Sequence, residues 1–223
     1  MKEKNLEFPI HLLMTLCGGF FGAYAIFNRF GIFANAQTAN LIELVGDLIG
    51  RDFSEVLLRL GAFFIFVLAI ILSVPLERHF HRKLKYLTIA AEMATVIIVG
   101  FFPEEMNPFF ALYPLFFIAA LQWCTFTGAK GFTVANIFST NNVKQTFLSL
   151  TEYFLDRKKK PEQASEKARK AQVFGGTLLA FYSGAAFGYG GSIFLGLKCI
   201  WICLLPLFLV LLLLLTEEKK SAV

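Results

Sequence analysis

The sequence predicts an all-α membrane protein with six transmembrane helices. We expect two inverted three-helix repeats, with short, interrupted helices after the first and fourth spans. The 223-residue chain is 57% hydrophobic and 17% charged, whereas soluble domains are nearer half apolar and a quarter charged. Its apolar residues gather in long stretches without the alternation of a β-strand. A polar motif also occurs twice, at corresponding places in the two halves.

The apolar stretches have the length that a membrane requires. The hydrocarbon core is about 30 Å thick and a helix rises about 1.5 Å per residue, so a spanning helix needs about 20 apolar residues. Lipid offers no partner for an unpaired backbone group, which leaves helices as the spanning structure. Six stretches meet or approach this length: residues 10–27, 60–76, 84–102, 109–127, 173–194 and 197–215.

The basic residues predict how these spans are oriented. Most of the 21 lysines and arginines fall in the two termini, in 78–85 and in 144–170, which six spans place on one side. The opposite connection 103–108 carries only glutamates as charged residues. An excess of Lys and Arg marks the cytoplasmic side, so we expect both termini in the cytoplasm. The chain has a net charge of +5, and its one-sided distribution suits a lipid surface. We expect no nucleic acid as a partner.

The repeat follows from two short motifs. The first span is followed by residues 33–41 and the fourth by residues 135–143, and each segment holds a Thr-x-Asn at the same place. We expect a first repeat over residues 1–107 and a second over 108–223, within one membrane domain. A cytoplasmic linker of about residues 156–172 joins the halves. Three spans per half reverse the second half in the membrane, which is the inverted-repeat plan of many transporters.

These motifs resemble those of a known family. The segments 19–24 (GFFGAY) and 32–40 (IFANAQTAN), Gln122 before the second Thr-x-Asn, and Glu92 in the third span are similar to the YoaK-like family of uncharacterised bacterial proteins. The resemblance implies a six-helix inner-membrane protein without an assigned substrate. The chain departs from the family pattern at Gly22, where members often carry Asp, so no role for that acid is carried over.

The paired motifs are the first candidate site. Their side chains offer donors and acceptors without charge, and backbone outside a helix is tolerated at membrane depth only in protein or beside a water-filled cavity. They therefore predict a central site for a small neutral or zwitterionic solute, or alternatively simple capping of the following helices. The candidate residues are Asn35, Gln37, Thr38, Asn40, Gln122, Asn136, Thr140 and Asn142. Gln122 is open to a further interpretation, as an ordinary interhelical hydrogen bond.

A second candidate is the pair Glu92 and Lys130. Glu92 is the one carboxylate well inside a predicted span, and intramembrane acids face a partner or a cavity. We expect Glu92 and Lys130 both toward the inner side, either as a proton- or cation-coupling group or as a structural ion pair.

The leading hypothesis is a small secondary transporter or facilitator, with a channel as its close variant. The alternative is a scaffold or sensor in the membrane. The glycine clusters 18–22 and 184–188 would allow a homodimer. We expect no enzyme, no catalytic residue, no cofactor and no metal, because the sequence holds no zinc-protease, nucleophile-elbow or phosphate-loop motif. Its four cysteines, all in predicted spans, have no histidine or carboxylate beside them.

Overall fold

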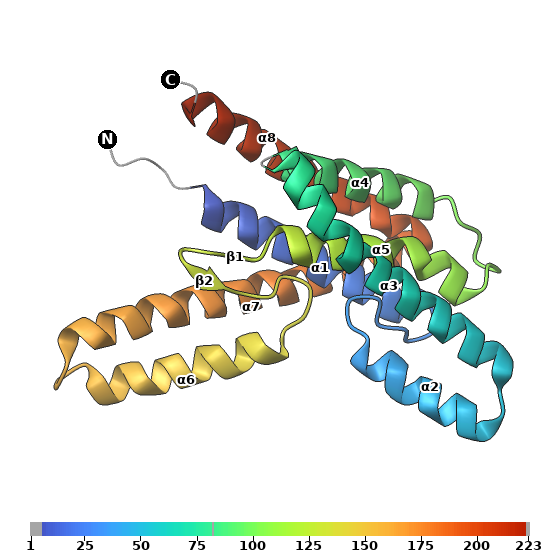
Figure 1. Ribbon diagram of the computed structural model, residues 1–223, viewed down its shortest axis with the longest axis horizontal. Helices are drawn as coiled ribbons and strands as arrows, with labels where there is room; N and C mark the ends of the chain where they lie inside the picture. Colours follow the sequence, from blue (N-terminus) through green and yellow to red (C-terminus); the bar gives the residue numbers. More distant parts are fainter. Residues whose placement is uncertain (1–5, 82, 222–223) are drawn as a thin grey trace.

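The computed structural model describes residues 6–81 and 83–221, and it is 82% helical. The first half runs through α1 (Glu7–Asn28), α2 (Thr38–Gly50), α3 (Phe53–Phe80) and α4 (Lys83–Val99). The second runs through α5 (Pro108–Thr125), a small hairpin of β1 (Gly128–Ala129) and β2 (Phe132–Thr133), α6 (Thr140–Asp156), α7 (Pro161–Leu195), the 3₁₀ helix η1 (Gly196–Cys203) and α8 (Leu204–Ser221). Figure 1 shows this order of elements.

Helices that are long and apolar enough to span a membrane are present, as expected, but their bounds differ from those of the six stretches. Among the described residues, four segments are long and apolar enough to cross a membrane: α1, α3, α5 and the 58-residue run Pro161–Glu218. This last run contains α7, η1 and α8 without a non-helical break, and η1 turns the chain back at its far end (Figure 1). The expected third span corresponds to α4, which has only 17 residues.

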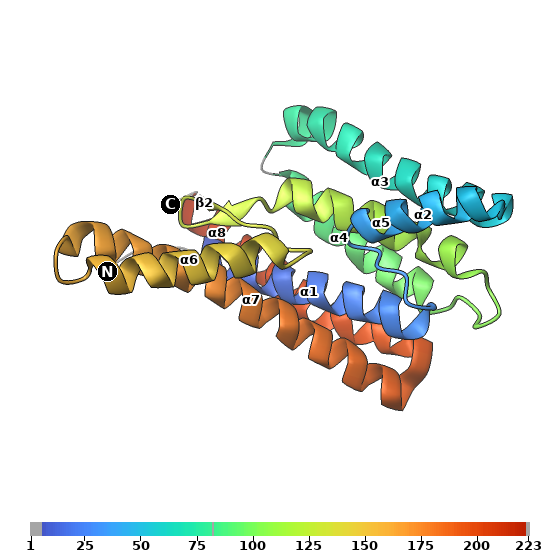
Figure 2. The same cartoon turned by 90° about the horizontal axis from the view of Figure 1, so that it is seen from below.

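The expected linker 156–172 is not a separate connector. Pro161 occupies the first turn of α7, where its missing N–H has no helical partner to lose. From there the helix continues for 35 residues into the apolar segment. Its first part pairs with α6 as a projecting hairpin, and α2 pairs with the start of α3 in the same manner at the opposite end (Figure 2).

Each of these helical hairpins is held by a basic residue of its long helix. Arg59 of α3 bonds Glu43 and Asp47 of α2, at 2.5 and 2.6 Å. Lys167 of α7 bonds Glu152 of α6 at 2.6 Å.

Helix α1 lies at the centre of the bundle. In its apolar window 72% of residues are buried, against 28% in the window of α3. The close approach of α1 and α7 depends on glycine: a Cβ at Gly19 would collide with the Phe181 carbonyl, and one at Gly184 with the Leu16 carbonyl. The two glycine clusters therefore pack within one chain.

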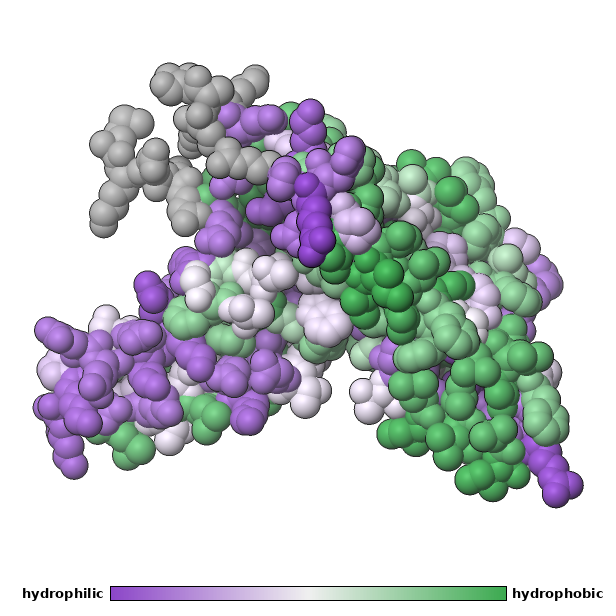
Figure 3. Space-filling view, in the orientation of Figure 1, coloured by the Kyte–Doolittle hydropathy of each residue, from purple (hydrophilic) through white to green (hydrophobic). Residues whose placement is uncertain are grey.

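The halves pack against each other in an exchanged arrangement. The first helix of each half makes its most extensive contact with the long helix of the other half, α1 with α7 and α5 with α3. The first helix of each half also packs on the last helix of the other half, α1 on α8 and α5 on α4. Large apolar side chains remain exposed over α2 and α3, where Figure 3 shows a continuous hydrophobic surface. The tip of the α6–α7 hairpin is hydrophilic in the same view.

A local backbone feature also recurs after α1 and after α5. Phe30 and Gly31 both have positive φ (56° and 79°), and so do Lys130 and Gly131 (53° and 82°). Consecutive left-handed residues make a tight turn that favours glycine at its second position. The chain thus leaves each first helix through the same kind of turn before it enters the polar motif.

Candidate solute site at the paired motifs

The two polar loops meet at the middle of α1. A side chain at Gly18 would collide with the carbonyl of Asn136, from the second loop. A Cβ at Gly22 would lie 2.7 Å from the Phe33 ring and 3.0 Å from the Asn35 amide nitrogen, both from the first loop. Glycine at these two positions, one turn apart on α1, is what admits both loops.

Asn35 joins the two motifs directly. Its amide nitrogen donates to the Gly18 carbonyl at 2.6 Å and to the Ile137 carbonyl at 2.8 Å. The residue is completely buried, so these bonds form where water does not compete with them. One side chain of the first motif therefore fixes both α1 and the loop of the second motif.

Asn40 and Asn142 each bond their own loop, and the pattern of hydrogen bonds is the same in both halves. The Asn40 amide donates to the carbonyls of residues 33 and 36, both at 3.1 Å. The Asn142 amide donates to those of residues 135 and 138, at 2.7 and 3.4 Å. Each asparagine thus bonds the carbonyls seven and four residues before it, and so holds its own loop against the start of the next helix.

The two threonines begin α2 and α6, and both are exposed. No side-chain capping bond forms at the N-cap of α2, Gln37, or at that of α6, Ser139. The asparagines of the motif instead hold the preceding loops through their amide nitrogens.

Two further amides complete the buried cluster. Gln122 of α5 donates to the Met14 carbonyl of α1 at 2.9 Å, and Asn136 donates to the Phe126 carbonyl at 2.9 Å. Both side chains are fully buried.

The amide nitrogens in this cluster are occupied, but the oxygens are not. Within the part of the chain that the structure describes, the buried side-chain oxygens of Asn35, Asn136, Asn142 and Gln122 have no partner, and neither end of the Gln37 amide has one. Buried polar atoms are normally bonded, so this set of acceptors suits a ligand that carries N–H or O–H donors, or ordered water.

Glu92 lies in α4 with neither oxygen bonded in the described part of the chain, although the residue is fully buried. One turn before it, the Thr88 hydroxyl pairs with that of Thr125 at 3.0 Å. Glu92 therefore faces the interior of the bundle.

The structure does not bring Glu92 and Lys130 together. Lys130 sits at the turn between β1 and β2, where its backbone N–H donates to a Glu7 oxygen at 3.0 Å. Its ammonium lies 4.2 Å from the centre of the Phe8 ring. The hairpin carries Lys130 to the start of α1, whereas Glu92 is buried inside the bundle. Sequence reasoning placed both on one side but did not anticipate the hairpin.

Comparison with known proteins adds the family. Residues 10–213 match the model of a family described as "Protein of unknown function (DUF1275)". The chain belongs to this family. No curated protein matches the chain, and no solved structure does.

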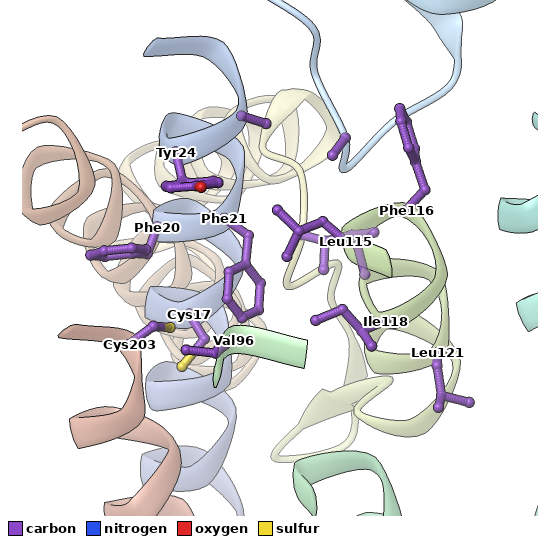
Figure 4. Close-up of a cluster of buried hydrophobic side chains, with 14 of the residues drawn as sticks. Cys17, Phe20, Phe21, Tyr24, Val96, Leu115, Phe116, Ile118, Leu121 and Cys203 are labelled. Carbon is purple, nitrogen blue, oxygen red and sulfur yellow. The ribbon is translucent and has the colours of Figure 1, made fainter. Parts of the chain in front are cut away.

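Two buried groups of this DUF1275 protein were not singled out in the sequence. Cys17 and Cys203, far apart in sequence, meet between α1 and η1, where Figure 4 shows them beside Val96. Arg29, one residue beyond α1, is buried although it is charged. Spacing gave no signal for the cysteines, but an arginine beside an apolar span could have been found by its charge.

Proposed function

We propose that this DUF1275 protein is a small secondary transporter or facilitator of a small polar solute, neutral or zwitterionic. The observation that carries the proposal is the meeting of the two polar loops at Gly18, with buried amide oxygens left unpartnered beside it. Acceptors without donors inside an apolar bundle cost free energy unless a ligand or water satisfies them. A solute with amine, amide or hydroxyl donors would supply those partners.

The proposal includes six spans in two inverted repeats. Three observations support it: the repeated left-handed turns, the matching bonds of Asn40 and Asn142, and the exchanged packing of α1 on α7 and α5 on α3. Inverted repeats that meet at the midplane are the common basis of alternating access. We place the protein in the cytoplasmic membrane of a bacterium with both termini inside, on the distribution of Lys and Arg.

Glu92 is the proposed coupling group. Its carboxyl is buried in α4, which packs on α5 and α8, and it has no bonded partner within the described residues. Protonation there would remove a charge from the bundle interior, which is the requirement for linking a proton to a conformational change. Transport by the Glu92→Gln variant should lose its pH dependence. Unchanged pH dependence would remove Glu92 from the mechanism.

A thermal-stability screen of the purified protein tests the site. The panel contains amino acids, nucleobases, polyols and vitamins, because a ligand that binds only the folded state raises its stability by about 2.7 kcal/mol at a hundredfold excess over its Kd. The test variant is Gln122→Met, which removes a free acceptor at similar length; the control is Asn141→Ala, at an exposed position. We expect a stabilising solute whose effect persists in the control and disappears in Gln122→Met. A solute that stabilises all three proteins equally would move the site elsewhere.

A further inference from the structure

Arg29 is a buried cation without a counter-charge. It is only 1% exposed and is the largest of the fully buried side chains. A guanidinium does not deprotonate in proteins, so it remains charged there. Across the described residues, no carboxylate lies within 4 Å of it. Buried charges in proteins are normally paired or bound to a ligand, because burial of a charge without a partner is unfavourable.

The hydrogen bonds of Arg29 leave one edge of the guanidinium free. Nη1 donates to the Pro103 and Glu104 carbonyls, at 3.2 and 3.3 Å. Nε and Nη2 are buried and have no partner. These two nitrogens form the side edge of the planar group, where two N–H bonds point the same way. This is the fork that grips both oxygens of a carboxylate.

A further donor lies next to this edge. The buried Tyr24 hydroxyl, five residues earlier on α1, interacts with the guanidinium electrostatically, and among the described residues it has no hydrogen-bond partner that meets the geometric criteria for such a bond. A tyrosine hydroxyl that is buried normally has a partner. Arg29 and Tyr24 therefore present three unused donor atoms, which are Nε, Nη2 and the hydroxyl oxygen, and one full positive charge. Neither side chain carries a negative charge.

We propose that Arg29 and Tyr24 form a binding site for a carboxylate at the end of α1. The Nε–Nη2 edge holds the two carboxylate oxygens, and the Tyr24 hydroxyl donates to one of them. Arg29 follows Gly18 by eleven residues, about 16 Å along the helix axis, so this site is separate from the paired motifs. It stands whether or not those motifs bind a solute.

The test is the thermal stability of the purified protein in acetate, compared with chloride at the same ionic strength and with phosphate. We expect acetate to raise the melting temperature of the wild type in a saturable manner. Arg29→Gln should lose this response without loss of stability in chloride, because it removes a buried charge that has no counter-charge. Arg29→Lys should respond at several-fold higher acetate, since an ammonium lacks the fork. Tyr24→Phe should shift the response in the same direction.

Arg51→Gln is the matched control, because Arg51 is exposed, and it should respond as the wild type does. An acetate response that survives in Arg29→Gln would overturn the proposal. So would a wild type that responds to phosphate but not to acetate, or a wild type that responds to neither. Destabilisation of Arg29→Gln in chloride, with no acetate response in the wild type, would show that Arg29 only anchors the 103–104 backbone.

Discussion

Removal of the Asn35 side chain should weaken the fold far more than removal of a neighbouring exposed amide. In Asn35→Ala the carbonyls of Gly18 and Ile137 lose the donor that they share. The Gly18 carbonyl lies inside α1, where a helical N–H remains available to it. The Ile137 carbonyl lies in a loop and is buried, so it bears most of the loss.

The magnitude follows from these two bonds. A buried group left without its partner costs about 1–3 kcal/mol, whereas interhelical hydrogen bonds measured in a membrane average about 0.6 kcal/mol. One bond of each kind gives about 1.6–3.6 kcal/mol for Asn35→Ala. Asn35→Asp should cost more, because an ionised carboxylate would face two carbonyl oxygens that can only accept.

Equilibrium unfolding of the purified protein in mixed detergent micelles measures this difference. Asn141→Ala is the control, since Asn141 is exposed beside the second motif, and it should lie within about 0.5 kcal/mol of the wild type. An Asn35→Ala variant as stable as this control would refute the idea that Asn35 joins the two loops.

Three other predictions concern packing and charge. Gly184→Leu should prevent normal folding, because even its Cβ collides with the α1 backbone, whereas Gly190→Ala should fold with normal yield in a size-exclusion assay, because its Cβ meets open space. Glu92→Gln should unfold no earlier than the wild type in thermal scans, since it removes an acid without a bonded partner; a large loss of stability would reveal a partner for Glu92. Lys167 holds the pKa of Glu152 below its ordinary value through a hydrogen bond, so this pair stabilises the fold above the unfolded carboxyl pKa and its contribution disappears as pH falls through the folded pKa. The stability difference between wild type and Glu152→Gln should therefore be present at neutral pH and vanish in acid, and a difference independent of pH would contradict this.

Much of the fold could be predicted because hydrophobicity and glycine act locally. The apolar stretches predicted where α1, α3 and α5 lie to within a few residues at most ends, and the two motifs predicted short helices that became α2 and α6. The extent of α7 was not predictable in the same way. Its first turns are hydrophilic, and they are stabilised by pairing with α6, as the Lys167–Glu152 bond illustrates. Tertiary contacts of this kind leave no periodic signal in the sequence.

The arrangement of the paired motifs was predicted only in part. The motifs do meet, but Asn40 and Asn142 bond their own loops, whereas Asn35 makes the contact between halves. Sequence spacing shows which residues repeat, but it does not show which amide side chain of a motif bonds the other half. Lys130 illustrates the same limit, because the six-residue hairpin 128–133 places its side chain on Phe8.

Solute flux through proteoliposomes tests the central claim most directly. The solute is the one that stabilises the purified protein in the binding screen, added outside vesicles that contain wild type, Gln122→Met, Asn141→Ala or no protein. We predict saturable uptake by the wild type and by Asn141→Ala, with at least tenfold slower uptake by Gln122→Met at the same solute concentration. Binding without uptake above empty vesicles would contradict a transporter, and equal uptake by Gln122→Met would contradict a site at the paired motifs.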